Sequence, residues 1–227
     1  MIRLHDMRHG PFEAIEELNP RAVAGRLRIC ITVDTESCPC LPEASLVARL
    51  LAGFPGLSRH GCRARTASAP SPTAGTRILL VEGEPSANQA HPLEHLVLDL
   101  LGVFEPSVLR SGVTRAWQEP PERNDIFIER RDLATGTGTA AISLAMLAFE
   151  NALEDRPLTP LFGDVVRVWS VFAQAQAAPV SPRHVAHRSG LPRTRVEQAL
   201  AVLTDNRLLR SEPFAVHISG ETHFRTR

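Results

Sequence analysis

The chain of 227 residues is 43% hydrophobic and 22% charged, so it can bury the core of one or two globular domains. Its 25 basic residues are all arginine and balance 25 acidic residues, and this zero net charge gives no global sign of a nucleic-acid or anionic-membrane partner. We find no signal-peptide segment at the N-terminus and no apolar run near the roughly 18 residues of a membrane span, so we expect a cytoplasmic protein. In that compartment the four cysteines, whose spacing matches no standard zinc pattern, are expected to be buried thiols.

The first part of the sequence mixes strand and helix patterns without strict alternation, which predicts an α+β domain. Apolar residues at every second position predict a strand at 25–34, and an aliphatic stripe that ends at Gly53 predicts a helix at 43–53. The stretch 63–76 is rich in Ala, Ser, Thr, Arg and Pro, as in a loop. Further strands are predicted at 2–7, 77–84 and 124–132, and further helices at 92–101 and 138–153.

The sequence becomes helical after Arg156-Pro157, which we interpret as a linker. We therefore predict an α+β domain at 1–156 and an all-α or winged-helix domain at 157–227. The C-terminal elements are predicted as helices at 160–176, 181–189 and 192–206, followed by a short hairpin through 208–218.

Residues 181–210 have the pattern of a helix–turn–helix. Ser181 suits an N-cap, Pro182 suits the first helical position, and Gly190 allows a tight turn between two helices. The core positions of the second helix are expected to be Val196, Leu200 and Leu203.

DNA binding and protein contact are both open for this segment. Arg193 and Arg195 stand where a recognition helix begins, and such residues can contact DNA phosphates. Winged helices also serve as dimerisation or partner modules, so a homo-oligomer is equally compatible with the pattern.

His91-Pro92-Leu93-Glu94-His95 spells H-x-x-E-H, the inverted form of the zinc-peptidase signature. Two imidazoles four residues apart on a helix can reach one metal ion, and the carboxylate between them can act as general base toward a water molecule. The alternative interpretation is structural. Leu93, Leu96 and Val97 lie on one helical face, so the motif can be the solvated polar side of a surface helix.

A zinc site needs at least one more protein ligand. Glu129, on the strand at 124–132, is the first candidate, although it can also be a surface carboxylate beside neighbouring arginines. His60 is the second, and it joins Glu94 among the residues that could act in catalysis; its alternative is a loop histidine without a role. Asp99 could hold one of the histidine rings as a hydrogen-bond acceptor.

Residues 1–155 resemble the N-terminal domain of cyanophycin synthetase and related Mur-ligase-like amide ligases. The order and spacing of several short motifs carry this resemblance. They are the opening strand at 2–4, a strand ending Val-Asp at 29–34, FPGLSRHGC at 54–62, AHPLEHLVLDLL at 90–101 and FIERR at 127–131.

In cyanophycin synthetases that domain handles a polymer with an aspartate backbone and arginine side chains. In some members it is a metal-dependent hydrolase that cuts the polymer. The resemblance therefore implies that His91 and His95 are metal ligands and that Glu94 is the base. The chain departs from the family in lacking the ATP-grasp and ligase modules, in the segment before the motif, and in having Ala90 and Leu101 where the family has Gly and Gln.

Two hypotheses follow. The first is a zinc-dependent hydrolase of amide bonds in a peptide or polyamide. The second is a non-enzymatic ligand-binding module coupled to a winged helix that contacts DNA or protein through 181–210.

Overall fold

The computed structural model describes residues 2–12, 28–35, 43–59, 61–62, 78–79, 90–104, 111–120, 122–129, 137–158, 160–175, 178–213 and 222–226. The predicted loop at 63–76 and His60 lie outside the described residues.

Four strands form an antiparallel sheet in the order β1–β2–β6–β5. The two central strands pair from Arg28 opposite Glu129 to Asp34 opposite Arg123. The bounds of the strands are Ile2–Gly10 for β1, Arg28–Thr35 for β2, Gly112–Ala116 for β5 and Arg123–Glu129 for β6.

Side chains alternate between the two faces of this sheet. Ile31 of β2 and Ile126 of β6 are direct neighbours on one face and belong to the main hydrophobic core. Cys30 and Phe127 point to the other face and form a separate small apolar cluster. Cys30 is a buried free thiol, as predicted.

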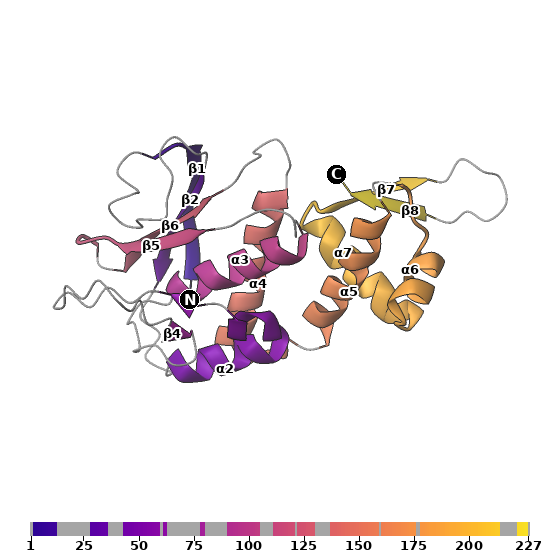
Figure 1. The fold of residues 1–227 in the computed structure, drawn as a ribbon, viewed down its shortest axis with the longest axis horizontal. Helices are drawn as coiled ribbons and strands as arrows, with labels where there is room; N and C mark the ends of the chain where they lie inside the picture. The colour runs from indigo at the N-terminus through magenta and orange to yellow at the C-terminus, as the bar shows by residue number, and fades with distance from the viewer. Residues whose placement is uncertain are drawn as a thin grey trace, which may run out of the picture.

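The helices of the first part lie on the Ile31 side of the sheet (Figure 1). Of these helices, α3 packs along α4 and against β5 and β6. The short β3 and β4 pair with one another. The bounds are Glu43–Gly53 for α2, Pro55–Arg59 for the 3₁₀ helix η1, Ala90–Phe104 for α3, Thr137–Leu153 for α4, Gly61–Cys62 for β3 and Ile78–Leu79 for β4.

The C-terminal part contains three helices and a hairpin (Figure 1). Within it, α5 packs on α6 and α7, and Val180 forms an isolated bridge to Phe224 of β8. The bounds are Leu161–Gln174 for α5, Pro182–Ser189 for α6, Arg193–Asp205 for α7, Leu209–Pro213 for β7 and Thr222–Thr226 for β8.

The turn between α6 and α7 follows the sequence signals. The Ser181 side chain accepts a hydrogen bond from the His184 N–H at 3.2 Å and caps α6. Gly190 has a φ of 69°, in the left-handed region that favours glycine. The predicted core positions Val196, Leu200 and Leu203 are buried, as expected. That these elements form a winged helix stays a prediction.

One hydrophobic core runs through both parts of the molecule. The rings of Phe54 and Phe162 have centroids 5.5 Å apart, and those of Phe104 and Trp169 are 4.8 Å apart. The boundary predicted at 156–157 falls just after α4, but the core continues across it. That the two parts are separable domains stays a prediction.

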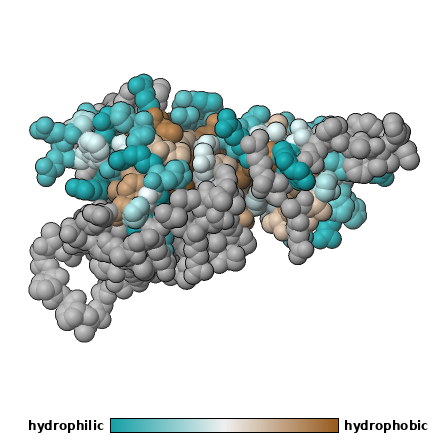
Figure 2. Space-filling view, turned by 90° about the horizontal axis from the view of Figure 1, so that it is seen from above, coloured by the Kyte–Doolittle hydropathy of each residue, from teal (hydrophilic) through white to brown (hydrophobic). Residues whose placement is uncertain are grey.

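Figure 2 shows hydrophobic residues in patches among hydrophilic ones on the face that it views. Among the described residues, the exposed large hydrophobic side chains are Leu4, Trp117 and Leu147. In the same part of the chain, no helix combines the length and the apolar composition that a bilayer crossing requires.

The α+β class is confirmed, and six predicted helices appear near their expected bounds. Three of the described elements were not predicted, namely η1, β3 and β5. The hairpin is present, but its second strand, β8, begins at Thr222 and not within 208–218.

Candidate functional site on helix α3

The H-x-x-E-H motif occupies the first two turns of α3. Glu94 and His95 are each only 5% exposed, which is comparable to the apolar residues of the same helix. The alternative of a solvated polar face is therefore wrong. Its premise was that polar residues on an amphipathic helix point to water, but β5 packs against α3 and covers the Glu94 side.

The two imidazoles lie together at the start of α3. Residues four apart on a helix are neighbours on its surface, and the Nε2 atoms of His91 and His95 are 3.0 Å apart. A tetrahedral zinc ion with Zn–N bonds of about 2.0–2.1 Å holds two ligand nitrogens roughly 3.3 Å apart. The observed separation is thus close to that of two ligands, and it also fits a hydrogen bond between two neutral rings.

Burial favours the neutral form of the His91 ring. It lowers the pKa of His91 below the ordinary value, because a charged imidazolium loses hydration there. A neutral imidazole is the form that binds a metal ion.

Glu94 projects from α3 to the edge strand β5. The Thr114 hydroxyl donates a hydrogen bond of 2.5 Å to its Oε2. On the same strand, a Cβ added to Gly112 would lie only 2.6 Å from Oε1, so glycine makes this close approach possible. These two neighbours could not be predicted from the sequence, because β5 has only five residues and no clear strand periodicity.

Burial raises the pKa of Glu94 to about 7, and the Thr114 hydrogen bond partly opposes this shift. A carboxyl group that titrates near neutral pH can both accept and return a proton under physiological conditions. Perturbed acids of this kind are concentrated at functional sites.

Asp99 lies one helical turn after His95 and contacts η1. A side chain at Gly56 of η1 would overlap the Asp99 carboxylate, so the two elements approach closely at this point. This contact brings the FPGLSR segment against the same helix as the motif.

Glu129 does not join the imidazoles. Thr114, which holds Glu94, is the register partner of Ile126, so Glu94 lies on the helix-covered face of the sheet. Glu129 alternates with Ile128 and points to the opposite face, where the Ser111 hydroxyl donates a hydrogen bond of 2.9 Å to it.

The side of the sheet on which Glu129 lies argues against it as the third ligand, and that role stays a prediction. The second choice, His60, lies outside the described residues. Within the part of the chain that the structure does describe, no three His, Cys, Asp or Glu side chains are grouped so as to hold a metal ion.

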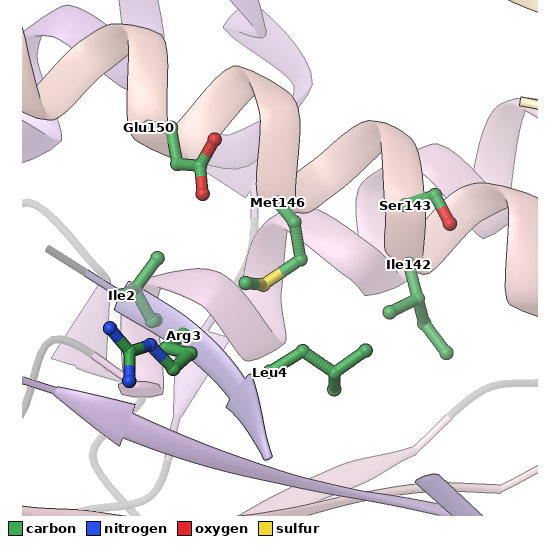
Figure 3. Close-up of a pocket in the computed structure, with 7 residues that line it drawn as sticks. All are labelled: Ile2, Arg3, Leu4, Ile142, Ser143, Met146 and Glu150. Atoms are coloured by element: carbon green, nitrogen blue, oxygen red, sulfur yellow. The ribbon is translucent and has the colours of Figure 1, made fainter. Parts of the chain in front are cut away.

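A hollow of about 420 Å³ lies elsewhere, between β1 and α4 (Figure 3). Mainly apolar side chains line it, with Arg3 and Glu150 as its charged groups. None of the motif residues lines it, so it offers an apolar surface and not the acid–base chemistry of α3.

Arg193 and Arg195, expected at the start of a recognition helix, both have carboxylate partners within the protein. The Arg195 guanidinium donates two hydrogen bonds of 2.6 Å to the buried carboxylate of Asp164 on α5. Arg193 pairs with Glu197 at 2.8 Å on the surface of α7. Arg195 is therefore part of the packing between α5 and α7.

No protein-family model matches this chain, and neither a curated protein nor a solved structure matches it. The resemblance to the cyanophycin synthetase domain stays a prediction from short motifs.

Proposed function

We propose that the protein is a metal-dependent hydrolase of amide bonds, with His91 and His95 as metal ligands and Glu94 as general base. The observation that carries this proposal is the pair of Nε2 atoms 3.0 Å apart, on the same two helical turns as the buried carboxyl group of Glu94. Burying that carboxyl group costs free energy that a purely structural helix would avoid.

The donor set suits zinc. Neutral imidazole nitrogens are common zinc ligands, and burial keeps His91 neutral. A bound zinc ion would supply Lewis acidity, polarising a carbonyl oxygen and lowering the pKa of a water toward about 7. His60 remains the third ligand to test, since it follows η1 directly in the sequence and η1 contacts α3.

Glu94 handles the proton in this proposal. The Thr114 hydroxyl fixes Oε2, so the carboxyl group keeps one orientation through the reaction. Glu94 takes a proton from the attacking water and returns it to the nitrogen of the leaving amine. A pKa near 7 suits both transfers.

The substrate class follows from the resemblance and not from the described pocket geometry. We propose a peptide or a polyamide, and among polyamides one with an acidic backbone or arginine-bearing side chains.

Metal content is the first test. We expect about one zinc per chain in protein never exposed to chelator, and its loss in His95→Ala. His187→Ala is the matched control, because His187 is an exposed histidine on α6 and should leave the metal content unchanged. Substoichiometric zinc in the wild-type protein would exclude the hydrolase.

Activity is the second test. New amine ends released from candidate polyamides are compared between wild type and Glu94→Gln. Losing a general base typically slows a reaction about 10²–10⁴-fold, while the metal should be retained. Equal rates in the two proteins would show that α3 does not carry the active site.

The second candidate is a ligand-binding module coupled to a winged helix. The order α5, Val180 bridge, α6, α7 and β7–β8 hairpin favours it, because a winged helix has this succession of elements. The ion pair of Arg195 with Asp164 removes one of the two expected phosphate contacts, which favours a protein partner over DNA. Absence of metal together with salt-dependent DNA binding would support the DNA-binding form of this candidate.

A further inference from the structure

A polar hollow of about 450 Å³ lies between α5 and α6, and none of the residues of the H-x-x-E-H motif lines it. Arg167, Ser170, Val171 and Gln174 line it from one face of α5, at spacings of three and four residues. Arg188 and Ser189, from the last turn of α6, complete the lining.

The hollow has an excess of positive charge. Its lining contains two guanidinium groups and no carboxylate. Arg188 donates a hydrogen bond of 3.1 Å to Oε1 of Gln174, which holds it against α5. Within the described residues, neither Arg167 nor Arg188 forms an ion pair, whereas Arg195 on α7 is paired with Asp164.

Two like charges in one hollow repel each other. An anion bound between them is attracted to both, and these two attractions outweigh the repulsion. The C-terminal end of α6 opposes an anion, but its partial charge of about half a unit is smaller than two full charges. The hydroxyl groups of Ser170 and Ser189 add neutral donors to those of the arginines.

We propose that this hollow binds a phosphate-type oxyanion. Arginine presents a fork of N–H donors that matches phosphate oxygens, and two forks from different helices suit a tetrahedral anion better than a planar carboxylate. A phosphomonoester of a small molecule and a phosphodiester of nucleic acid present the same oxygens to this hollow. The proposal is independent of metal binding and hydrolysis at α3.

The test uses the full chain and inorganic phosphate as the probe, with binding followed by calorimetry at low ionic strength, where exposed charges are least screened. Arg167→Gln/Arg188→Gln is the test variant, and both positions are exposed, so the substitutions do not open the core. Arg183→Gln is the matched control, because Arg183 is an exposed arginine on α6 that does not line the hollow.

We expect the wild type and the Arg183 variant to bind phosphate alike, and the double variant to bind it about 10- to 100-fold more weakly, as for the loss of charge-assisted hydrogen bonds. A parallel titration with short duplex DNA distinguishes the two sources. If the wild type binds DNA, if phosphate competes with that binding and if the double variant loses it, the ligand is a phosphodiester. If the wild type binds phosphate but not DNA, the ligand is a phosphomonoester. No phosphate binding by the wild type, or equal binding by the double variant, would overturn the proposal.

Discussion

The buried carboxyl group of Glu94 should make the stability of the metal-free protein depend on pH. Its pKa is raised from the ordinary 4.5 to about 7 mainly by burial, so the folded protein holds a proton that the unfolded chain releases. The stability that the folded protein gains from holding this proton is fully present below about pH 4.5. It is lost as the pH rises through 7. At about 1.4 kcal/mol per pKa unit, the loss amounts to about 3 kcal/mol.

Glu94→Gln removes the titration and keeps the shape of the side chain, including an oxygen that can accept the Thr114 hydrogen bond. We expect the variant to resemble the wild type at pH 4.5 and to be about 3 kcal/mol more stable at pH 8.5. Urea unfolding in the presence of a chelator measures both free energies of unfolding. Glu119→Gln is the control, since that carboxylate is exposed.

The comparison of wild type with variant cancels the titration of the histidines, which are common to both proteins. If the free energy of unfolding has the same pH dependence in wild type, Glu94→Gln and Glu119→Gln, then Glu94 is not a buried acid and the reasoning about α3 fails.

Two further substitutions test neighbouring contacts. Thr114→Val removes the hydrogen bond that lowers the pKa of Glu94. The pH midpoint at which the free energy of unfolding falls should therefore rise above about 7. An unchanged or lower midpoint in the same urea series would contradict the role of Thr114. Arg195→Ala leaves the Asp164 carboxylate buried without its ion pair and should cost about 1–3 kcal/mol, a range that allows for the partial exposure of Arg195. Arg193→Ala, which breaks only a surface pair, should cost less than about 0.5 kcal/mol, and equal costs by urea unfolding would refute the structural role of Arg195.

The helical periodicity of the sequence was enough to predict α3 and to place His91, Glu94 and His95 on one side of it. It could not predict that this side is buried, because hydrophobic periodicity assigns carboxylates and imidazoles to the solvent. The burial depends on β5, a strand of five residues that has no clear apolar alternation. The burial of Glu94 thus follows from a tertiary contact that the local sequence pattern does not contain.

The position of Glu129 could not be predicted for a different reason. Its strand was predicted, but the face on which a strand residue lies relative to a distant helix depends on sheet register and on which face the helices cover. Arg195 is a similar case, because its partner Asp164 lies 31 positions earlier in the chain. Both side chains have roles that only the assembled fold defines.

The pairing of β2 with β6 limits the order in which this protein can fold. The Thr32 hydroxyl donates a hydrogen bond to the carboxylate of Asp125, which lies 93 residues later in the chain. The central strands of the sheet therefore cannot pair until most of the first part of the chain has been synthesised. Contacts among α5, α6, α7 and the β7–β8 hairpin join segments much closer in sequence and can form quickly. We therefore expect the slow pairing of β2 with β6 to limit the overall folding rate. Until β6 pairs with it, the free edge of β2 can pair with other chains and cause aggregation.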